Sequence, residues 1–197
     1  MRIHPHGGHD GHHGHGHLDN PVHGKAVAYD RVAGRLMRRP FRRIAADLVR
    51  QLPPGAELLD VGTGPGRLLV EVARRRPDVR VTGVDLAPDM VEIARGHLAE
   101  FGERATALVA DVRELPFPDG AFDVIVSTLS LHHWADPAAG AVELARVRRP
   151  GGQIRIYDLR SAPFAELQTA ITGTGTRRTT RFRISPLPAP ALRLLVI

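Results

Sequence analysis

The sequence predicts a doubly wound α/β fold of the Rossmann-like type, because strand-like and helix-like segments alternate along most of its 197 residues. Apolar runs with the composition of buried strands alternate with helical patterns and with turns rich in glycine and proline. Segments in this order form right-handed crossovers and a parallel sheet that helices cover on both faces. The expected strands are residues 58–60, 79–85, 105–110, 122–128 and 153–159.

A glycine-rich turn follows the first strand directly. Residues 58–66 read Leu-Leu-Asp-Val-Gly-Thr-Gly-Pro-Gly, and glycines allow the backbone to turn sharply and to approach a ligand closely. A helix is expected next, at residues 67–76. Asp85 ends the second strand, 23 residues after the first of these glycines. A carboxylate at that place can bind both hydroxyls of a ribose.

Two details of the turn argue against a dinucleotide. Asp60 lies just before the first glycine, where it would repel a pyrophosphate. The third glycine follows the second by two residues, whereas the dinucleotide fingerprint has a spacing of three. An acid beside the turn suits a ligand with a cationic end, such as the ammonium and sulfonium of S-adenosylmethionine. The alternative is a tight strand-to-helix turn that binds no ligand.

Polar or glycine residues mark the ends of four expected strands. Gly62, Asp85, Asp111 and Thr128 each lie at or just after such an end. Ligands of parallel sheets bind at the carboxyl ends of the strands. We therefore expect these four residues to meet at one edge of the sheet and to form a ligand site.

The region from about residue 29 to residue 159 resembles a class I S-adenosylmethionine-dependent methyltransferase. It is most similar to the small-molecule group (methyltransferase type 11 domain) that contains the ubiquinone and menaquinone C-methyltransferases. The resemblance implies a seven-stranded, mainly parallel sheet with an antiparallel last strand, and residues 179–184 and 192–197 fit the closing pair. The matching segments are residues 59–66, 84–90, 110–117, 122–127, 131–134 and 146–152.

The resemblance also implies which residues bind S-adenosylmethionine. Gly62 and Gly64 would pack against its methionine portion, with Asp60 near the ammonium group. Asp85 would hold the ribose hydroxyls, and Asp111 would accept a hydrogen bond from the adenine amino group. The complete set is Tyr29, Asp60, Gly62, Thr63, Gly64, Gly66, Asp85, Leu86, Asp111, Val112 and Thr128.

Four members of this set have more peripheral roles in the resemblance. Leu86 would flank the adenine, and the backbone N–H of Val112 would serve a ring nitrogen. Thr128 would lie beside the methionine end. Tyr29 belongs to a segment that matches the aromatic lid of these enzymes, although an aromatic residue on an amphipathic helix can equally be part of the core.

Methyl transfer from a sulfonium is an in-line displacement, so catalysis depends mainly on alignment and on exclusion of water. A general base is needed for some acceptors, and His132 and His133 follow the fourth strand where the methyl group should point. Adjacent side chains point apart, so we expect only one to face the site; a solvent-facing or helix-capping histidine is the alternative. Tyr157 and Asp158 are weaker candidates. Trp134 would stack on an aromatic substrate or pack against the next helix.

Composition limits the class of protein. The chain has no cysteine, which excludes disulfides and a cysteine nucleophile. No run of 18 apolar residues could span a membrane, and the lack of an apolar signal segment favours the cytoplasm. The net charge is +6, but Lys25 is the only lysine, and such an arginine bias indicates a GC-rich genome before a nucleic-acid partner. The sequence indicates no oligomeric state.

Residues 1–24 form a separate region that holds eight of the 11 histidines. A segment of histidine and glycine cannot bury apolar surface, so we expect a disordered tail. Clustered imidazoles bind Ni, Cu or Zn ions, and a metal-handling protein acting through this tail is one alternative function; adventitious metal affinity is the simpler interpretation. The possible ligands are His9, His12, His13, His15 and His17.

A nucleic-acid methyltransferase is the other alternative function, because it would share the fold. Amino-group methylases of that type carry Asn or Asp, then Pro-Pro and an aromatic residue, after the fourth strand. This chain has Ser-Leu-His-His-Trp at residues 130–134, which favours a small-molecule acceptor.

The remaining segments flank the methyltransferase domain, which we expect at residues 53–197. Within residues 25–52, apolar side chains recur at helical spacing, and Pro40 should divide the region into two short helices that cover the sheet edge and the cofactor mouth. Further helices are expected from Pro137 to Val147, capped by Asp136, and at residues 162–172. Many members of the family carry a longer substrate-covering insertion before the sixth strand, whereas only about 20 residues separate the fifth and sixth strands here. A substrate lid must therefore be small or come from the N-terminal helices, which puts a quinone substrate in doubt.

Overall fold

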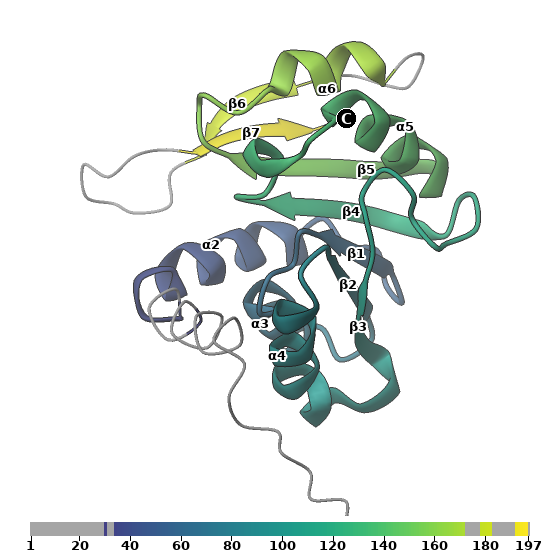
Figure 1. Ribbon diagram of the computed structural model, residues 1–197. Coiled ribbons are helices and arrows are strands. Elements are labelled where there is room, and N and C mark those ends of the chain that lie inside the picture. Colours follow the sequence, from purple (N-terminus) through teal and green to yellow (C-terminus); the bar gives the residue numbers. More distant parts are fainter. Residues whose placement is uncertain (1–29, 31–33, 172–177, 183–191, 197) are drawn as a thin grey trace, which may run out of the picture.

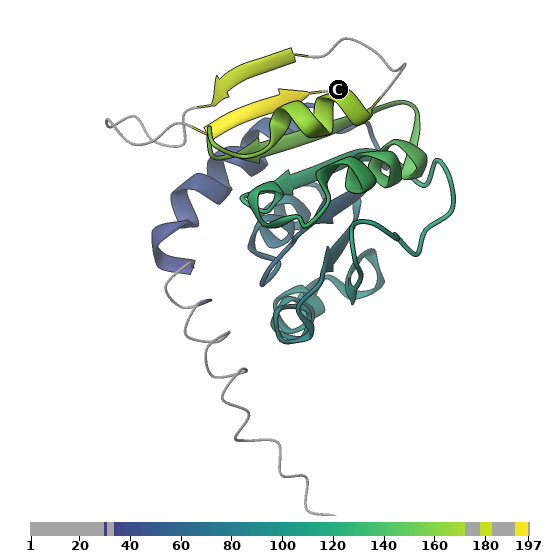
Figure 2. The ribbon, with the colours of Figure 1, turned by 45° about the horizontal axis from the view of Figure 1, so that its top comes forward.

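A central sheet with helices on both faces organises the molecule (Figures 1 and 2). The computed structural model describes residues 30, 34–171, 178–182 and 192–196. Five parallel strands follow one another across the sheet in the order β3-β2-β1-β4-β5. Their bounds are β1 Glu57–Val61, β2 Arg80–Asp85, β3 Ala105–Val109, β4 Phe122–Thr128 and β5 Arg148–Asp158. The predicted Rossmann-like parallel sheet is confirmed.

Each face of the sheet has its own apolar core, because neighbouring strand residues point to opposite faces. Leu58 belongs to the core beneath α2, α3 and α4, and Leu59 to the core beneath α5 and α6. Two short 3-10 helices, η1 and η2, complete the helical segments. Their bounds are α2 Arg38–Val49, α3 Arg67–Arg75, α4 Pro88–Leu98, η1 Ala99–Arg104, η2 Leu131–His133, α5 Pro137–Val147 and α6 Phe164–Ala170.

Two strands differ from their predicted bounds. β1 continues one residue beyond Asp60, so this acid lies inside the strand and not at its end. β5 begins at Arg148, because Arg148 already pairs with Phe122 before the Pro-Gly-Gly turn at residues 150–152; the register then shifts, and pairing resumes at Gln153 opposite Val124. The turn at 150–152 is therefore an irregularity within the strand and does not precede it.

The predicted role of Pro40 is wrong. Pro40 lies in the first turn of α2, where a backbone N–H has no helical acceptor and its loss costs nothing. The break in the helical segment falls at Met37, the residue before α2. The helix also covers a face of the sheet and not its edge, because Ile44 and Leu48 pack with residues of β1, β4 and β5.

The predicted helices after the fourth strand agree with the structure. α5 starts at Pro137, and the Asp136 carboxylate accepts a hydrogen bond from the backbone N–H of Ala139 at 2.9 Å. α6 falls within the expected residues 162–172. Beyond β5, backbone pairing places β7 (Leu192–Val196) antiparallel to β5 and β6 (Arg178–Phe182) antiparallel to β7.

Candidate active site

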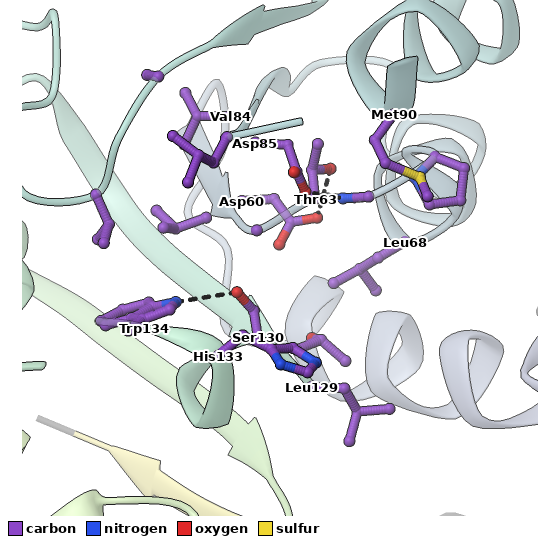
Figure 3. A pocket seen from close by; sticks show the side chains of 18 of the residues that line it. Asp60, Thr63, Leu68, Val84, Asp85, Met90, Leu129, Ser130, His133 and Trp134 are labelled. Atoms are coloured by element: carbon purple, nitrogen blue, oxygen red, sulfur yellow. Dashed lines mark hydrogen bonds between the residues drawn. The ribbon is translucent and has the colours of Figure 1, made fainter. Parts of the chain in front are cut away.

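A pocket of about 340 Å³ opens at the carboxyl ends of β1, β2 and β4 (Figure 3). Every described residue of the predicted cofactor set except Gly66 lines it. Tyr29 lies outside the described residues. The set that lines the pocket is Asp60, Gly62, Thr63, Gly64, Asp85, Leu86, Asp111, Val112 and Thr128.

The three glycines of the turn have left-handed backbone torsions, which side chains disfavour, but their surroundings differ. A Cβ at Gly62 would overlap the side chain of Ser130. A Cβ at Gly64 would meet no atom within 4 Å, so this part of the backbone borders open space. Gly66 instead packs against α4, where its Cβ would lie 3.1 Å from that of Ala94. Gly66 therefore permits the close approach of two helices and does not line the pocket.

Asp60 is a buried acid with one unused oxygen. Its side chain is 2% exposed, and Oδ2 accepts a hydrogen bond from the Thr63 hydroxyl at 2.9 Å. Oδ1 has no hydrogen-bond partner among the described residues. Burial raises the pKa of Asp60 to about 7, and the nearby charge of Asp85 acts in the same direction. The hydrogen bond from Thr63 acts in the opposite direction but is outweighed. A cationic ligand group in the pocket would supply the missing partner.

Backbone hydrogen bonds hold the Asp85 carboxylate in place. Gly64 N–H donates to Oδ2 at 2.8 Å, and Ala87 N–H donates to Oδ1 at 3.0 Å. Each carboxylate oxygen keeps a lone pair for a ligand hydroxyl. The neighbouring Leu86 is 68% exposed, an apolar surface that a planar ring could cover.

The Asp111 carboxylate is already engaged by a residue that the sequence did not single out. Arg113 Nε lies 3.0 Å from both oxygens, and Arg113 Nη2 lies 2.6 Å from Oδ2. These hydrogen bonds, and a further one from the Arg113 backbone N–H, lower the pKa of Asp111. Arg113 and Val112 both line the pocket. A ligand amino group at Asp111 would therefore share an ionised carboxylate with Arg113.

A strained residue follows β4 at the pocket wall. Leu129 has a φ of +54°, the only left-handed torsion of a non-glycine residue in the described part of the chain. Its N–H donates to the Tyr157 carbonyl at 2.8 Å. The Thr128 hydroxyl before it is buried and has no hydrogen-bond partner among the described residues. Strain of this kind is concentrated at functional sites, and the sequence gives no signal of it because leucine is not a left-handed residue.

The two candidate histidines have different surroundings. His133 lines the pocket, whereas His132 does not. His132 Nδ1 lies 2.7 Å from Oδ1 of Asp158, an acid with no exposed surface. The ring centroids of the two histidines are 4.0 Å apart. Asp158 thus holds the ring of the solvent-exposed His132, which does not line the pocket, whereas His133 faces the cavity.

Tyr157 is not a site residue. Its hydroxyl donates to Asp47 Oδ2 at 2.7 Å and lies beneath α2, where Arg155 Nη2 also donates to that oxygen at 2.6 Å. Burial and the Asp47 charge raise the pKa of Tyr157. Neighbouring residues of a strand point to opposite faces, so Tyr157 points toward α2 whereas Asp158 points to the other face. The expected catalytic role for Tyr157 is therefore wrong.

Trp134 packs against the next helix, which is one of its two predicted roles; stacking on an aromatic substrate stays a prediction. It lines the pocket, and its Nε1–H donates to the Ser130 hydroxyl at 3.0 Å. Its ring also packs on α5, since a Cβ at Gly140 would lie 3.0 Å from it. In Figure 3, Trp134, Ser130 and His133 form a wall opposite Met90, while Asp60 and Asp85 lie beside the glycine turn.

The mouth of the pocket is apolar and comes partly from the N-terminal region. Met37 and Phe41 line it from α2 and from the residue before α2. Asp30 lies nearby in the chain and is buried, accepting hydrogen bonds from Arg67 Nε at 2.8 Å and Nη2 at 2.6 Å. This lining agrees with the expectation that the segment 25–52 covers the cofactor mouth.

Within the described residues, no cluster of three or more His, Asp or Glu side chains could hold a metal ion. The five possible tail ligands between His9 and His17 lie outside these residues. In the same part of the chain, no helix is long and apolar enough to cross a bilayer.

Comparison with known proteins agrees with the fold and the pocket. A family described as "Methyltransferase domain" matches residues 58–152. The chain is 37% identical over 123 residues to a demethylmenaquinone methyltransferase of Thermus thermophilus, covering 62% of this chain and 56% of that protein. It is 36% identical over 157 residues to a malonyl-[acyl-carrier protein] O-methyltransferase of Laribacter hongkongensis, and this match covers 75% of this chain and 52% of that protein.

The solved structure of a SAM-dependent methyltransferase from Aquifex aeolicus has the same fold, with a TM-score of 0.68 at 20% identity over 88% of this chain and 97% of that one. The chain spans about half the length of the curated relatives it matches. The parallel sheet, the pocket at its carboxyl edge and these matches identify residues 58–152 as a methyltransferase domain of the class I S-adenosylmethionine-dependent type.

Proposed function

We propose that this chain transfers a methyl group from S-adenosylmethionine to a small-molecule acceptor by in-line displacement. The observation that carries the proposal is the unpartnered, buried oxygen of Asp60 in the same pocket as the anchored Asp85 carboxylate. One acid suits the ammonium group of the cofactor, and the other suits its ribose. A dinucleotide would instead bring a pyrophosphate toward Asp60.

The cofactor would lie along the carboxyl ends of the strands. Its methionine end would contact Asp60, the open backbone at Gly64 and the unpartnered hydroxyl of Thr128. Its ribose would bind Asp85. The adenine would lie on exposed Leu86, with Asp111 and the backbone N–H of Val112 as polar partners. Gly66 would act indirectly, through the packing of α3 on α4, and Tyr29 would close the site as a lid.

We propose His133 as the general base where the acceptor must lose a proton. When bound, S-adenosylmethionine supplies an electrophilic methyl group and leaves as a neutral thioether. His133 would accept the acceptor's proton as the nucleophile forms its bond to carbon. His132 is the alternative base, but its ring contacts Asp158 and does not line the pocket.

The pocket lining supports an organic acceptor with apolar surface. Met37, Phe41, Leu129 and Trp134 line the cavity, and such walls exclude water from the reacting groups. The names of the relatives, a demethylmenaquinone methyltransferase and a malonyl-[acyl-carrier protein] O-methyltransferase, support a small-molecule acceptor over nucleic acid. They also favour this function over a metal-handling role for the tail.

Two further statements belong to this proposal. We infer that β6 and β7 complete a seven-stranded sheet with an antiparallel last strand. The antiparallel pairing of β5 with β7, from Arg155 opposite Val196 to Asp158 opposite Arg193, supports this inference. The cytoplasmic location stays a prediction.

Calorimetry with the full chain tests the cofactor, with S-adenosylmethionine and NAD as competing ligands. We expect micromolar-range affinity for the former and a rise in melting temperature by mass action. Tighter binding of NAD would overturn the assignment. Radiolabelled cofactor with quinols, phenols, amines and small acids then identifies the acceptor by transfer of label to product.

A further inference from the structure

An exposed arginine face lies at the start of α2 and just before it. We define this arginine face as Arg35, Leu36, Arg38, Arg39, Arg42 and Arg43, all of which are exposed. Figure 2 shows that this end of α2, drawn in purple, extends from the body of the domain. The sequence contains no acid between Asp30 and Asp47 to balance these charges.

The arginines of this face are poorly paired. Arg42 Nε lies 4.0 Å from Glu71 Oε2, and the other four make no hydrogen bond or ion pair with another described residue. Elsewhere in the described chain, most arginines have a carboxylate partner. Examples are Arg67 with Asp30, Arg74 with Glu100, Arg76 with Asp78, Arg113 with Asp111 and Arg146 with Glu143. A genome-wide arginine bias does not explain this contrast.

The face also has an apolar component. Leu36 is 73% exposed, more than any other large apolar side chain in the described residues. Arg38, Arg39, Arg42 and Arg43 follow i, i+4 spacing, so they share one side of α2, and the buried Ile44 lies on the other. An exposed leucine beside these arginines offers a membrane surface one apolar contact, together with guanidinium groups for the lipid phosphates.

The location of the face relates it to the pocket. Met37 and Phe41, interleaved with these arginines, line the pocket mouth. Any surface that the arginine face binds therefore lies next to the entrance of the pocket.

We infer that the arginine face docks this chain onto an anionic lipid bilayer, with Leu36 entering the headgroup boundary. Guanidinium groups bind lipid phosphates through paired hydrogen bonds, and clustered basic residues bind negatively charged membrane surfaces. A nucleic acid would satisfy the arginines but offers no apolar layer for Leu36. The docking itself is independent of methyl transfer; only the consequence, delivery of an apolar acceptor from the bilayer, depends on the proposed function.

Cosedimentation of the full chain with vesicles tests the docking. We expect binding to vesicles of phosphatidylglycerol and phosphatidylcholine in equal parts, little binding to phosphatidylcholine alone, and weakening by salt. The experiment is run at pH 8, where the tail histidines are neutral. The variant R35Q/R38Q/R39Q/R43Q should bind the anionic vesicles about 100-fold more weakly or worse. Leu36→Gln leaves the net charge of the protein unchanged and should still weaken its binding to the anionic vesicles.

A matched control removes the same number of charges elsewhere. R50Q/R74Q/R80Q/R160Q alters exposed arginines away from the pocket mouth and should keep the vesicle binding of the unmodified chain. Equal loss in both variants, no sedimentation with anionic vesicles, or tighter binding of the face to duplex DNA or an acidic protein would overturn the inference. Cofactor binding measured in parallel must stay unchanged in both variants, so a failure of the proposed function is seen separately.

Discussion

His132 Nδ1 lies 2.7 Å from Oδ1 of Asp158, a carboxylate that is wholly buried at the end of β5. Asp158 Oδ1 also accepts from the Leu159 N–H at 2.6 Å. The Asp158 carboxyl also faces the backbone N–H of His132, with Oδ2 at 3.3 Å. This pair fixes η2 against β5 and leaves the next residue, His133, facing the pocket.

The first prediction separates the two histidines. His133→Gln should lower turnover by about 10²–10⁴ where the acceptor must lose a proton, with cofactor affinity nearly unchanged because the histidine contacts the acceptor side. His132→Gln should mainly lower stability, since it removes one partner of buried Asp158. Single-turnover rates and urea denaturation measure the two effects. Near-normal turnover in both variants would show that alignment alone carries the reaction.

The second prediction concerns Asp85. Asp85→Ala should weaken S-adenosylmethionine binding by about 1.5–3 kcal/mol, the scale of hydrogen bonds to a charged group. Part of that loss reflects the turn, because Asp85 also accepts from Gly64 N–H. Asp119→Ala is a matched control at an acid whose side chain is exposed. Calorimetric titration of both variants checks the prediction, and equal affinities would remove Asp85 from the ribose site.

The third prediction concerns the glycine turn. Gly64→Val should abolish cofactor binding, because a branched side chain would occupy the open space beside the backbone. Its φ of +53° also adds strain. Gly55→Val is the control, since Gly55 has a φ of +67°, equally open surroundings and no part in the pocket. Circular dichroism should show both variants folded; cofactor binding retained by the Gly64 variant would make the turn merely structural.

The sequence predicts the parts of the site that follow from topology. Strands in one parallel sheet end at one edge, so Asp85, Asp111 and Thr128 were expected near the glycine turn, and all three line the pocket. Features that depend on how individual side chains are placed could not be predicted. Ser130 fills the space beside Gly62, and Arg113 occupies the Asp111 carboxylate. Neither contact leaves a periodic signal in the sequence.

The last prediction uses the raised pKa of Asp60, which is about 7 in the folded chain against 3.8 for an unperturbed aspartate. The folded state binds this proton more tightly than the unfolded state, so the associated stability is present below about pH 4 and is lost as the pH rises through 7. Asp60→Asn removes the buried charge. It should raise the free energy of unfolding at pH 8 by about 2–4 kcal/mol and change it little at pH 3, below the unfolded pKa.

Cofactor binding should respond to the same substitution in the opposite direction. The ionised carboxylate is the form that pairs with an ammonium group, so S-adenosylmethionine affinity of the unmodified chain should rise from pH 6 to pH 8. Asp60→Asn should bind more weakly and lose this pH dependence, although it is the more stable protein at pH 8. Urea denaturation and calorimetry at the three pH values measure both effects. A variant that gains stability and keeps its affinity would show that the free oxygen of Asp60 does not meet the cofactor's cationic end.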